Sequence, residues 1–201
     1  MHPKEIGHSY DAIAHIWREP RIQSYGVPQL ERALGFASHC RSDCFALDVG
    51  CGCSGRFIEV LARHGFLVEG VDVSEKMIDL ARQSHPHILF HHEDICDWEF
   101  PRKYDFVLAW NSIWHIPLDR QEPVLRKVCE GLSPGGVFMF TTGGLDKAEE
   151  KSDPCMGGPM YYSALGIPKT LELLGRFGCI CRHLVYDQYH EQNLYIIEQR
   201  V

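Results

Sequence analysis

The fold class of this chain is decided by one stretch, Phe45-Ala46-Leu47-Asp48-Val49-Gly50-Cys51-Gly52-Cys53-Ser54-Gly55. It joins an apolar run to a glycine-rich turn, and an amphipathic segment follows at once, with Phe57, Ile58 and Leu61 on one face. This order predicts a buried strand, a tight turn and a helix. Glycines in such a turn let the backbone approach a bound molecule, and the free amides that open the helix face that molecule.

A second apolar run, residues 66–71, ends in an acidic residue, Asp72. The run predicts a neighbouring strand. A carboxylate at its end, about 20 residues after the glycine turn, can accept hydrogen bonds from both hydroxyls of a ribose. The first third of the chain therefore predicts a site for a nucleotide-like cofactor.

Length and charge exclude several classes of protein. The 201 residues suit a single domain spanning residues 1–201. A formal net charge of −7 argues against a nucleic-acid partner, because affinity for phosphate backbones comes mostly from lysine and arginine. No apolar run has the length of a signal peptide or a membrane span, so we expect a cytoplasmic protein with no membrane partner. The oligomeric state stays open.

Cysteines and histidines do not predict a metal site. The nine cysteines contain no C-x-x-C pair, and we expect them to be small buried thiols in a reducing compartment. His91 and His92 are adjacent in a predicted strand, so their side chains point to opposite faces and cannot share an ion. We therefore expect no metal.

Strand and helix signals alternate from residue 45 to residue 142. Ser74 has the character of a helix N-cap, and a helix from Asp119 to Leu132 precedes a strand at residues 136–141. The segments at residues 87–91 and 104–110 have the composition of short strands. Such alternation predicts an α/β fold with a doubly wound, mostly parallel sheet, which binds ligands at the carboxyl ends of its strands.

The two ends of the chain depart from this alternation. Residues 1–40 predict an N-terminal helical cap, with helices at 5–18 and 28–39, and residues 143–166 are too irregular for a core element. A helix from Pro168 to Leu174 leads to two strand-like runs, 179–186 and 194–199. Their short connection through Asp187, His190 and Glu191 predicts a C-terminal antiparallel hairpin, which brings the sheet to seven strands.

The spacing Gly50-x-Gly52-x-x-Gly55 also matches the dinucleotide fingerprint, which alone would favour NAD. Two features favour another cofactor. The carboxylate of Asp48 would repel a pyrophosphate, whereas it suits a cofactor that carries an ammonium and a sulfonium. The terminal hairpin is also not the usual second mononucleotide-binding half. An NAD(P)-dependent oxidoreductase is therefore the less favoured alternative.

Over residues 5–142, and more loosely to its end, the chain resembles the class I S-adenosylmethionine-dependent methyltransferases. Five segments occur in the order and spacing of that family: ALDVGCGCSGRF, VEGVDVSEKM, HHEDI, YDFVLAWNSIWHI and LSPGGVFMF. The chain departs from the family at Ser54, which stands where a third glycine is common, so its glycine turn is one residue longer. The resemblance implies a Rossmann-like methyltransferase fold and S-adenosylmethionine as the cofactor, with S-adenosylhomocysteine as its product.

The resemblance also implies roles for ten residues in binding the cofactor. It assigns Asp48, Gly50, Cys51 and Gly52 to the methionine part, Asp72 to the ribose hydroxyls, Val73, Met77, Asp94 and Ile95 to the adenine, and the carbonyl of Trp110 to the methionine ammonium. The alternatives are Met77 as a plain core residue, Asp94 as a plain turn residue and Asp72 as a solvated acid at a strand end.

The loop after the fourth strand, residues 111–117, limits the methyl acceptor. It lacks the Asn/Asp-Pro-Pro-aromatic motif of enzymes that methylate base amines. It also lacks the carboxylate cluster of the metal-dependent catechol enzymes and the paired glutamates of arginine methylation. The resemblance therefore implies a small-molecule acceptor with an O-, N- or S-nucleophile, reached by in-line displacement without a metal.

Tyr10 and His115 are the two candidates for catalytic residues. His115 is the one plausible base in the loop, with a capping or packing role as the alternative. Tyr10 belongs to an aromatic–Asp pair, Tyr10-Asp11, which in relatives places its ring over the cofactor, and a tyrosine face attracts a nearby sulfonium.

Residues 143–166 are expected to form a lid on the substrate side of the site. Met156, Met160, Tyr161 and Tyr162 would supply adaptable apolar surface to a small acceptor, or else simple strand-edge packing. A non-catalytic cofactor-binding subunit that activates a partner enzyme is the other alternative function.

Overall fold

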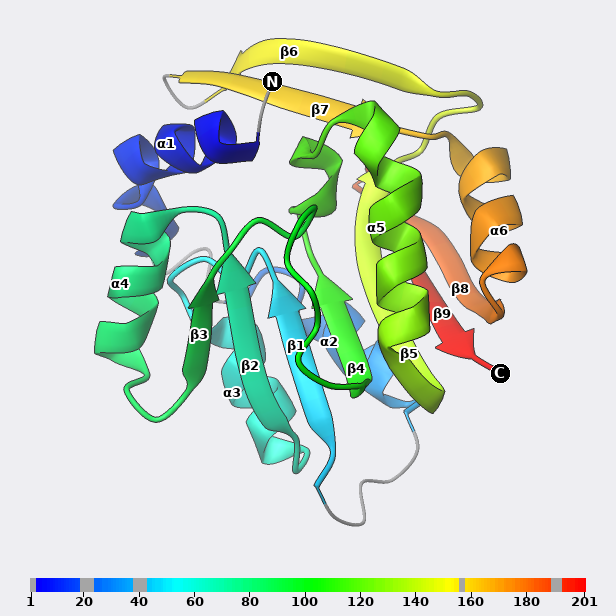
Figure 1. The fold of residues 1–201 in the computed structure, drawn as a ribbon, viewed down its shortest axis with the longest axis horizontal. Helices are drawn as coiled ribbons and strands as arrows, with labels where there is room; N and C mark the ends of the chain where they lie inside the picture. Colours follow the sequence, from blue (N-terminus) through cyan, green and yellow to red (C-terminus); the bar gives the residue numbers. More distant parts are fainter. Residues whose placement is uncertain (1–2, 19–23, 38–42, 156–157, 189–192) are drawn as a thin grey trace.

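The computed structural model describes residues 3–18, 24–37, 43–155, 158–188 and 193–201, and it confirms the mostly parallel α/β sheet (Figure 1). Seven strands pair in the order β3-β2-β1-β4-β5-β9-β8. Within this seven-stranded sheet, as far as the structure describes it, only β9 runs antiparallel to its neighbours, β5 and β8. The strands are β1 (Phe45–Val49), β2 (Leu67–Asp72), β3 (Leu89–His92), β4 (Tyr104–Ala109), β5 (Leu132–Gly143), β8 (Cys179–Gln188) and β9 (Asn193–Arg200).

The strand order reverses between β1 and β4. The chain passes outward from β1 to β2 and β3, then returns so that β4 pairs in parallel with the other side of β1. A crevice opens at the carboxyl ends of the strands where such a reversal occurs, because the connections leave in opposite directions. The topology therefore places the ligand site beyond the ends of β1, β2 and β4.

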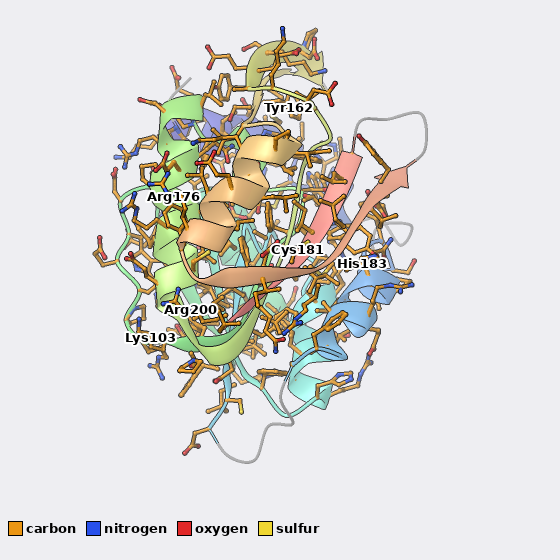
Figure 2. All side chains as sticks on the ribbon, turned by 90° about the vertical axis from the view of Figure 1, so that its right-hand side faces the viewer. Lys103, Tyr162, Arg176, Cys181, His183 and Arg200 are labelled. Carbon is orange, nitrogen blue, oxygen red and sulfur yellow. The ribbon has the colours of Figure 1, made fainter. Side chains whose placement is uncertain are left out.

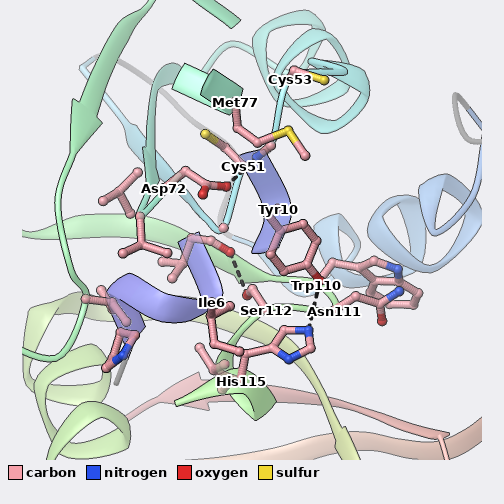
Figure 3. A pocket seen from close by; sticks show the side chains of 18 of the residues that line it. Ile6, Tyr10, Cys51, Cys53, Asp72, Met77, Trp110, Asn111, Ser112 and His115 are labelled. Carbon is pink, nitrogen blue, oxygen red and sulfur yellow. Dashed lines mark hydrogen bonds between the residues drawn. The ribbon is translucent and has the colours of Figure 1, made fainter. Parts of the chain in front are cut away.

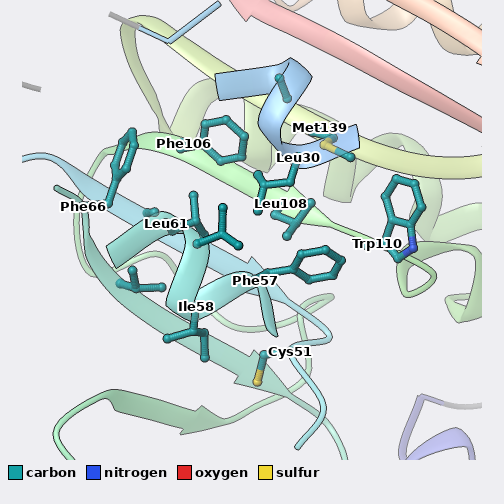
Figure 4. Close-up of a cluster of buried hydrophobic side chains, with 14 of the residues drawn as sticks. Leu30, Cys51, Phe57, Ile58, Leu61, Phe66, Phe106, Leu108, Trp110 and Met139 are labelled. Carbon is teal, nitrogen blue, oxygen red and sulfur yellow. The ribbon is translucent and has the colours of Figure 1, made fainter. Parts of the chain in front are cut away.

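Helices cover both faces of the sheet. On one face lie α2 (Val27–Leu34), α3 (Arg56–Arg63) and α4 (Glu75–Ser84). The core on this face brings Leu30 of α2 and Phe57 of α3 against Phe106 and Leu108 of β4 (Figure 4). The glycine turn that follows β1 leads directly into α3, so this packing also fixes the turn.

The other face is covered by α5 (Leu118–Gly131) and α6 (Ile167–Arg176). Val124, Leu125 and Val128 of α5 pack on Phe138 and Phe140 of β5, and these two rings stack with their centroids 4.5 Å apart. Beyond β5 and β9, strand β8 forms the outer edge of the sheet, where Figure 2 labels Cys181 and His183.

Residues 143–166 are not irregular, which corrects the sequence-based expectation. They contain an antiparallel hairpin of β6 (Glu149–Cys155) and β7 (Gly158–Ala164), a second sheet above the carboxyl ends of the main strands (Figure 1). The side chains of residues 149–154 are exposed, whereas Met160 and Tyr161 of β7 are buried. A strand with no apolar face gives no period-two signal, so β6 has the composition of a loop. Met156 lies outside the described residues.

Several predicted boundaries shift. The first predicted helix ends earlier, as α1 (Pro3–Ile13), and a short 3₁₀ helix (η1, Ile16–Arg18) follows it. Helix α5 begins at Leu118 with Pro117 as its N-cap, not at Asp119. Strand β5 begins at Leu132, four residues before the predicted start, because residue 132 already pairs with Tyr104 of β4. His190 and Glu191, which the predicted hairpin connection includes, lie outside the described residues.

The cysteines are mostly small buried thiols, as expected, with one correction. Among the described side chains, Cys51, Cys53, Cys96, Cys129 and Cys179 are free and buried, and Cys181 is free and exposed. Cys44, just before β1, is instead disulfide-bonded, which the sequence analysis did not anticipate. Among the residues that the structure describes, no helix combines the length and the apolar character needed to cross a membrane.

Candidate cofactor and active site

One cavity lies at the carboxyl ends of β1, β2 and β4, under helix α1 (Figure 3). Of the twelve residues that the sequence analysis assigned to the site, it gathers eleven. These are Tyr10, Gly50, Cys51, Gly52, Asp72, Val73, Met77, Asp94, Ile95, Trp110 and His115.

The glycine turn after β1 forms the floor of this cavity. Gly50 and Cys51 donate backbone hydrogen bonds to the Val71 carbonyl at 2.8 and 3.1 Å, which ties the turn to β2. Gly50 and Gly52 have φ angles of 71° and 57°, in the left-handed region that other residues enter at a cost. A Cβ on Gly52 would meet no atom within 4 Å. The backbone at Gly52 is therefore open to a ligand.

Asp72 is held rigidly at the end of β2. Its Oδ2 accepts a hydrogen bond from the Gly52 amide and its Oδ1 one from the Ser74 amide, both at 2.9 Å. Burial raises the pKa of this carboxyl, and the backbone amides of Ser74 and Gly52 lower it. Each carboxylate oxygen has two lone pairs, so both oxygens keep acceptor capacity toward the cavity.

The wall next to Asp72 is apolar and suits a flat ring. Ser74 is the N-cap of α4, and its hydroxyl accepts a hydrogen bond from the Met77 amide at 3.1 Å. This cap directs Met77 into the cavity wall, where it packs beside Cys53. Asp94 and Ile95 close the wall from the β3 side, and the Asp94 carboxylate accepts a hydrogen bond from the Cys96 amide at 2.9 Å.

Asp48 is the predicted site residue that does not line the cavity. It is 2% exposed, inside β1 beneath the glycine turn. Burial raises its pKa to about 7, with Arg56 lowering it and Asp72 raising it further. Asp48 can therefore influence a ligand through the electrostatic field, but its carboxylate does not form part of the wall.

Arg56 lines the cavity and was missed by the sequence analysis. Its Nε donates to the Tyr25 carbonyl at 2.9 Å and its Nη1 to the Ser54 hydroxyl at 2.8 Å. Burial lowers its pKa, and Asp48 raises it. The sequence did contain a signal. A cation in the first turn of a helix interacts unfavourably with the helix dipole, so its presence there indicates a role in binding or in an ion pair.

Two tryptophan side chains also line the cavity, and the Nε1–H group of each is buried. The Nε1–H groups of Trp17 and Trp110 have no hydrogen-bond partner in the part of the chain that the structure describes. Leaving such a buried donor unpaired costs about 1–3 kcal/mol, so each is suited to an acceptor on a ligand. Trp110 was expected to contribute its carbonyl. Its ring also packs against Phe57 and Tyr195, with centroids 6.2 and 5.9 Å away.

Tyr10 and His115 contact each other across the cavity (Figure 3). His115 Nδ1 lies 2.7 Å from the Tyr161 carbonyl, which can only accept, so Nδ1 carries the proton. The lone pair of Nε2 then accepts from the Tyr10 hydroxyl at 2.9 Å and from Trp114 Nε1 at 3.0 Å. Burial lowers the pKa of His115 to about 4, so the ring is neutral at pH 7.

Helix α1 is fastened over the cavity next to this pair. The Asp11 carboxylate accepts from the Ser74 hydroxyl at 2.6 Å and from the Lys76 amide at 3.1 Å. A Cβ on Gly7 would come within 2.7 Å of the Val73 carbonyl oxygen, so the helix lies directly on the end of β2. The Tyr10-Asp11 pair thus joins α1 to His115 on one side of the cavity and to Ser74 on the other.

The low pKa of His115 predicts a pH-dependent stability. The folded state holds this ring at a pKa of about 4 against an ordinary value of 6.5, so the unfolded chain binds the extra proton first as the pH falls. Between pH 7 and pH 5 this difference removes about 2 kcal/mol of unfolding free energy. Asp48 and Glu198, whose pKa values burial raises to about 7, act with the opposite sign.

A variant comparison isolates the contribution of His115. Urea unfolding of the wild type and of His115→Gln at pH 7 and pH 5 should show that the change in unfolding free energy on acidification is more favourable in the variant, by about 2 kcal/mol. An identical pH dependence in the two proteins would mean that His115 is not buried as a neutral ring.

Comparison with known proteins agrees with this geometry. Residues 46–136 match the family model described as a methyltransferase domain. The ubiquinone biosynthesis O-methyltransferase of Coxiella burnetii is 37% identical over 102 residues, which cover 48% of this chain and 42% of that protein. The 27-O-demethylrifamycin SV methyltransferase of Amycolatopsis mediterranei is 28% identical over 155 residues, covering 67% of this chain and 56% of its own. The chain thus spans about half the length of the curated relatives it matches.

Solved structures share the fold across the whole chain. The magnesium protoporphyrin IX methyltransferase of Synechocystis PCC 6803, solved with bound S-adenosylmethionine, superimposes with a TM-score of 0.73 at 16% identity. The match covers 100% of this chain and 98% of that one. The sheet topology and these matches show that the chain has the fold of the class I S-adenosylmethionine-dependent methyltransferases, with a methyltransferase-domain match over residues 46–136.

Proposed function

We propose that the chain transfers a methyl group from S-adenosylmethionine to a small-molecule acceptor. The observation that carries this proposal is the cavity floor, where the Asp72 carboxylate is fixed by the Gly52 and Ser74 amides beside an open glycine backbone. The experiment is transfer of a labelled methyl group from S-adenosylmethionine to a metabolite extract. A protein that binds the cofactor but transfers no label would instead be the activator subunit that the sequence left as an alternative.

The cavity residues fit this cofactor. Asp72 would accept the ribose hydroxyls, and Met77 with Val73 would lie against the adenine. The unpaired Nε1–H groups of Trp17 and Trp110 are suited to the methionine carboxylate, which is a strong acceptor. With the carboxylate bound in this way, both buried indole donors would gain the hydrogen-bond acceptor that they lack in the described chain.

The bound cofactor supplies an electrophilic methyl group, and the protein supplies alignment. Holding an acceptor in line with the methyl group can lower a barrier by about 7–11 kcal/mol without a catalytic acid or base. The Tyr10 ring lines the cavity, and its hydroxyl is held by neutral His115. Since the Nε2 lone pair of His115 is already engaged, we propose that His115 positions Tyr10 and does not itself take a proton from the acceptor.

A small acceptor agrees with the curated relatives, whose names describe methylation of ubiquinone precursors, a rifamycin and an amino sugar. No nucleic-acid partner is proposed, for the reason of charge given above.

We expect methyl transfer to need no divalent metal. Among the described residues, no group of three or more histidine, cysteine or acidic side chains is placed to hold an ion. Activity measured before and after EDTA treatment should therefore be the same within error. Loss of activity with EDTA and its return with magnesium would contradict this proposal.

Helix α1 and the β6–β7 hairpin are proposed to act together as a lid. Ile6 and Ile13 of α1 pack against Met160 and Tyr161 of β7, so the two segments share one small core. Hydrogen exchange should show residues 3–13 and 149–164 gaining protection together when S-adenosylhomocysteine is added, while β2 changes little. Equally slow exchange in both segments with and without ligand would show a preformed pocket.

A further inference from the structure

A second hollow lies between the β6–β7 hairpin, the carboxyl end of β5 and the amino end of β9. We call it the hairpin hollow. Its wall includes acidic side chains from β6, three aromatic rings and one buried amide; the residues used below are Tyr25, Asn111, Trp114, Glu149, Glu150, Lys151, Asp153, Tyr162 and Asn193. In Figure 2, Tyr162 lies beneath the hairpin at the top of the molecule.

The hairpin hollow meets the cofactor cavity at Asn111, which lines both. Asn111 follows β4 directly and has a φ of 53°, in the left-handed region. Its backbone amide donates a hydrogen bond to the Thr141 hydroxyl at 2.7 Å, which helps to hold that backbone conformation. A molecule in the hairpin hollow can therefore reach the cofactor cavity beside Asn111.

The charge of the hairpin hollow is negative. Glu149, Glu150 and Asp153 contribute three carboxylates against the single ammonium of Lys151. Glu150 accepts from the Tyr161 hydroxyl at 2.7 Å and Asp153 pairs with Lys151 at 2.9 Å, whereas the Glu149 side chain has no such partner among the described residues. The wall therefore favours a cation over an anion.

One ammonium already lies against this wall. Lys151 Nζ is 5.8 Å from the centroid of the Tyr162 ring, within the range of a cation–π contact. The Trp114 and Tyr162 rings lie with their centroids 6.2 Å apart. A cation brought by a ligand would compete with Lys151 for the Tyr162 face.

The buried side-chain amide of Asn193 is a second observation, separate from the charge of the wall, that points to a ligand. Asn193 is 6% exposed, and its Oδ1 has no hydrogen-bond partner within the described chain. An unpaired buried acceptor costs free energy until a donor reaches it. A ligand with an N–H or O–H group would satisfy Asn193 at the β9 side of the hairpin hollow.

These observations together point to one class of acceptor, and the inference rests on the proposed function. We propose that the hairpin hollow binds an aromatic acceptor that carries a protonated amine. The ammonium is a recognition group held by the β6 carboxylates and the Tyr162 face. It is not the nucleophile, because a protonated nitrogen has no lone pair; the methylated atom is a different one, at the Asn111 end.

The test compares three phenols whose side arms end in an ammonium, a methyl group and a carboxylate: tyramine, 4-ethylphenol and 3-(4-hydroxyphenyl)propanoate. Each is titrated calorimetrically into the protein saturated with S-adenosylhomocysteine. Tyramine should bind about 5-fold or more tightly than 4-ethylphenol, since one cation–π contact and one partly exposed ion pair each contribute modestly. The propanoate should bind most weakly.

Two substitutions should move the tyramine affinity in opposite directions. Glu149→Gln removes a carboxylate and should weaken tyramine about 3-fold, whereas Lys151→Met removes the competing ammonium and should strengthen it about 3-fold. Glu172→Gln, on the exposed face of α6 outside the hairpin hollow, is the matched control and should change nothing. 4-Ethylphenol should respond to none of the three.

The outcomes separate the two claims. Failure of S-adenosylhomocysteine to bind overturns the proposed function, and this inference with it. Normal binding of S-adenosylhomocysteine, with equal affinities for the three phenols, a preference for the propanoate or no binding of tyramine at millimolar concentration, overturns the inference alone.

Discussion

Replacing Gly50 by alanine is expected to lower the free energy of unfolding by about 2–5 kcal/mol, combining left-handed backbone strain with overpacking. Gly50 has a φ of 71°, and a Cβ there would lie 2.3 Å from the Ser112 Cβ. Ser112 cannot move aside freely, because its hydroxyl donates to the Val49 carbonyl at 2.7 Å. The substitution should therefore distort the turn that forms the cavity floor.

Gly65→Ala is the matched control for Gly50→Ala. Gly65 has a φ of 89°, but a Cβ there would meet nothing within 4 Å. This variant should lose only the backbone strain, about 1–2 kcal/mol. Urea unfolding of both variants gives the difference, which reports the clash with Ser112. Equal losses in the two variants would show that the turn is not packed against Ser112.

The Asp72→Ala variant should bind S-adenosylhomocysteine more weakly by about 1.5–3 kcal/mol, because hydrogen bonds to a charged acceptor are lost. That is a factor of about 10 to 150 in the dissociation constant. The variant also frees the Gly52 and Ser74 amides, which now hold the turn and the start of α4 in place. Calorimetric titration measures the affinity, and a urea melt shows whether the variant is folded.

Two further variants define what the Asp72 result means. Asp72→Asn keeps the shape and one carbonyl oxygen, so it should lose less affinity than Asp72→Ala. Asp79→Ala removes an exposed carboxylate of α4, which pairs with Arg82 at 3.8 Å, and should leave the affinity unchanged. An unchanged affinity in Asp72→Ala would remove the central element of the proposed site.

The part of the site that could be predicted from the sequence is local in origin. The β1–turn–α3 unit and the acid at the end of β2 each depend on a few consecutive residues, so periodicity and glycine spacing predict them. The pairing of β1 with β2 then brings Gly52 and Asp72 together, as their positions along the chain imply.

What could not be predicted depends on contacts distant in the sequence. The Tyr10–His115 hydrogen bond joins residues 105 positions apart, and neither residue type by itself indicates the other. Residues 149–153 of strand β6 are all polar, and among the described strands β6 pairs with β7 alone, so no apolar pattern marks it. Asp48 has the right spacing for a cavity residue, but its place inside β1 turns it beneath the floor and not into the wall.

Calorimetric titration with S-adenosylmethionine, S-adenosylhomocysteine and NADH tests the central claim most directly. The Asp72 carboxylate, the open backbone at Gly52 and the indole donors left unpaired in the described chain predict binding of both adenosyl compounds. The β8–β9 hairpin, in place of a second mononucleotide-binding half, predicts no binding of NADH. Binding of NADH with no response to S-adenosylmethionine or S-adenosylhomocysteine would contradict the account, and would instead support an oxidoreductase that uses the same glycine turn.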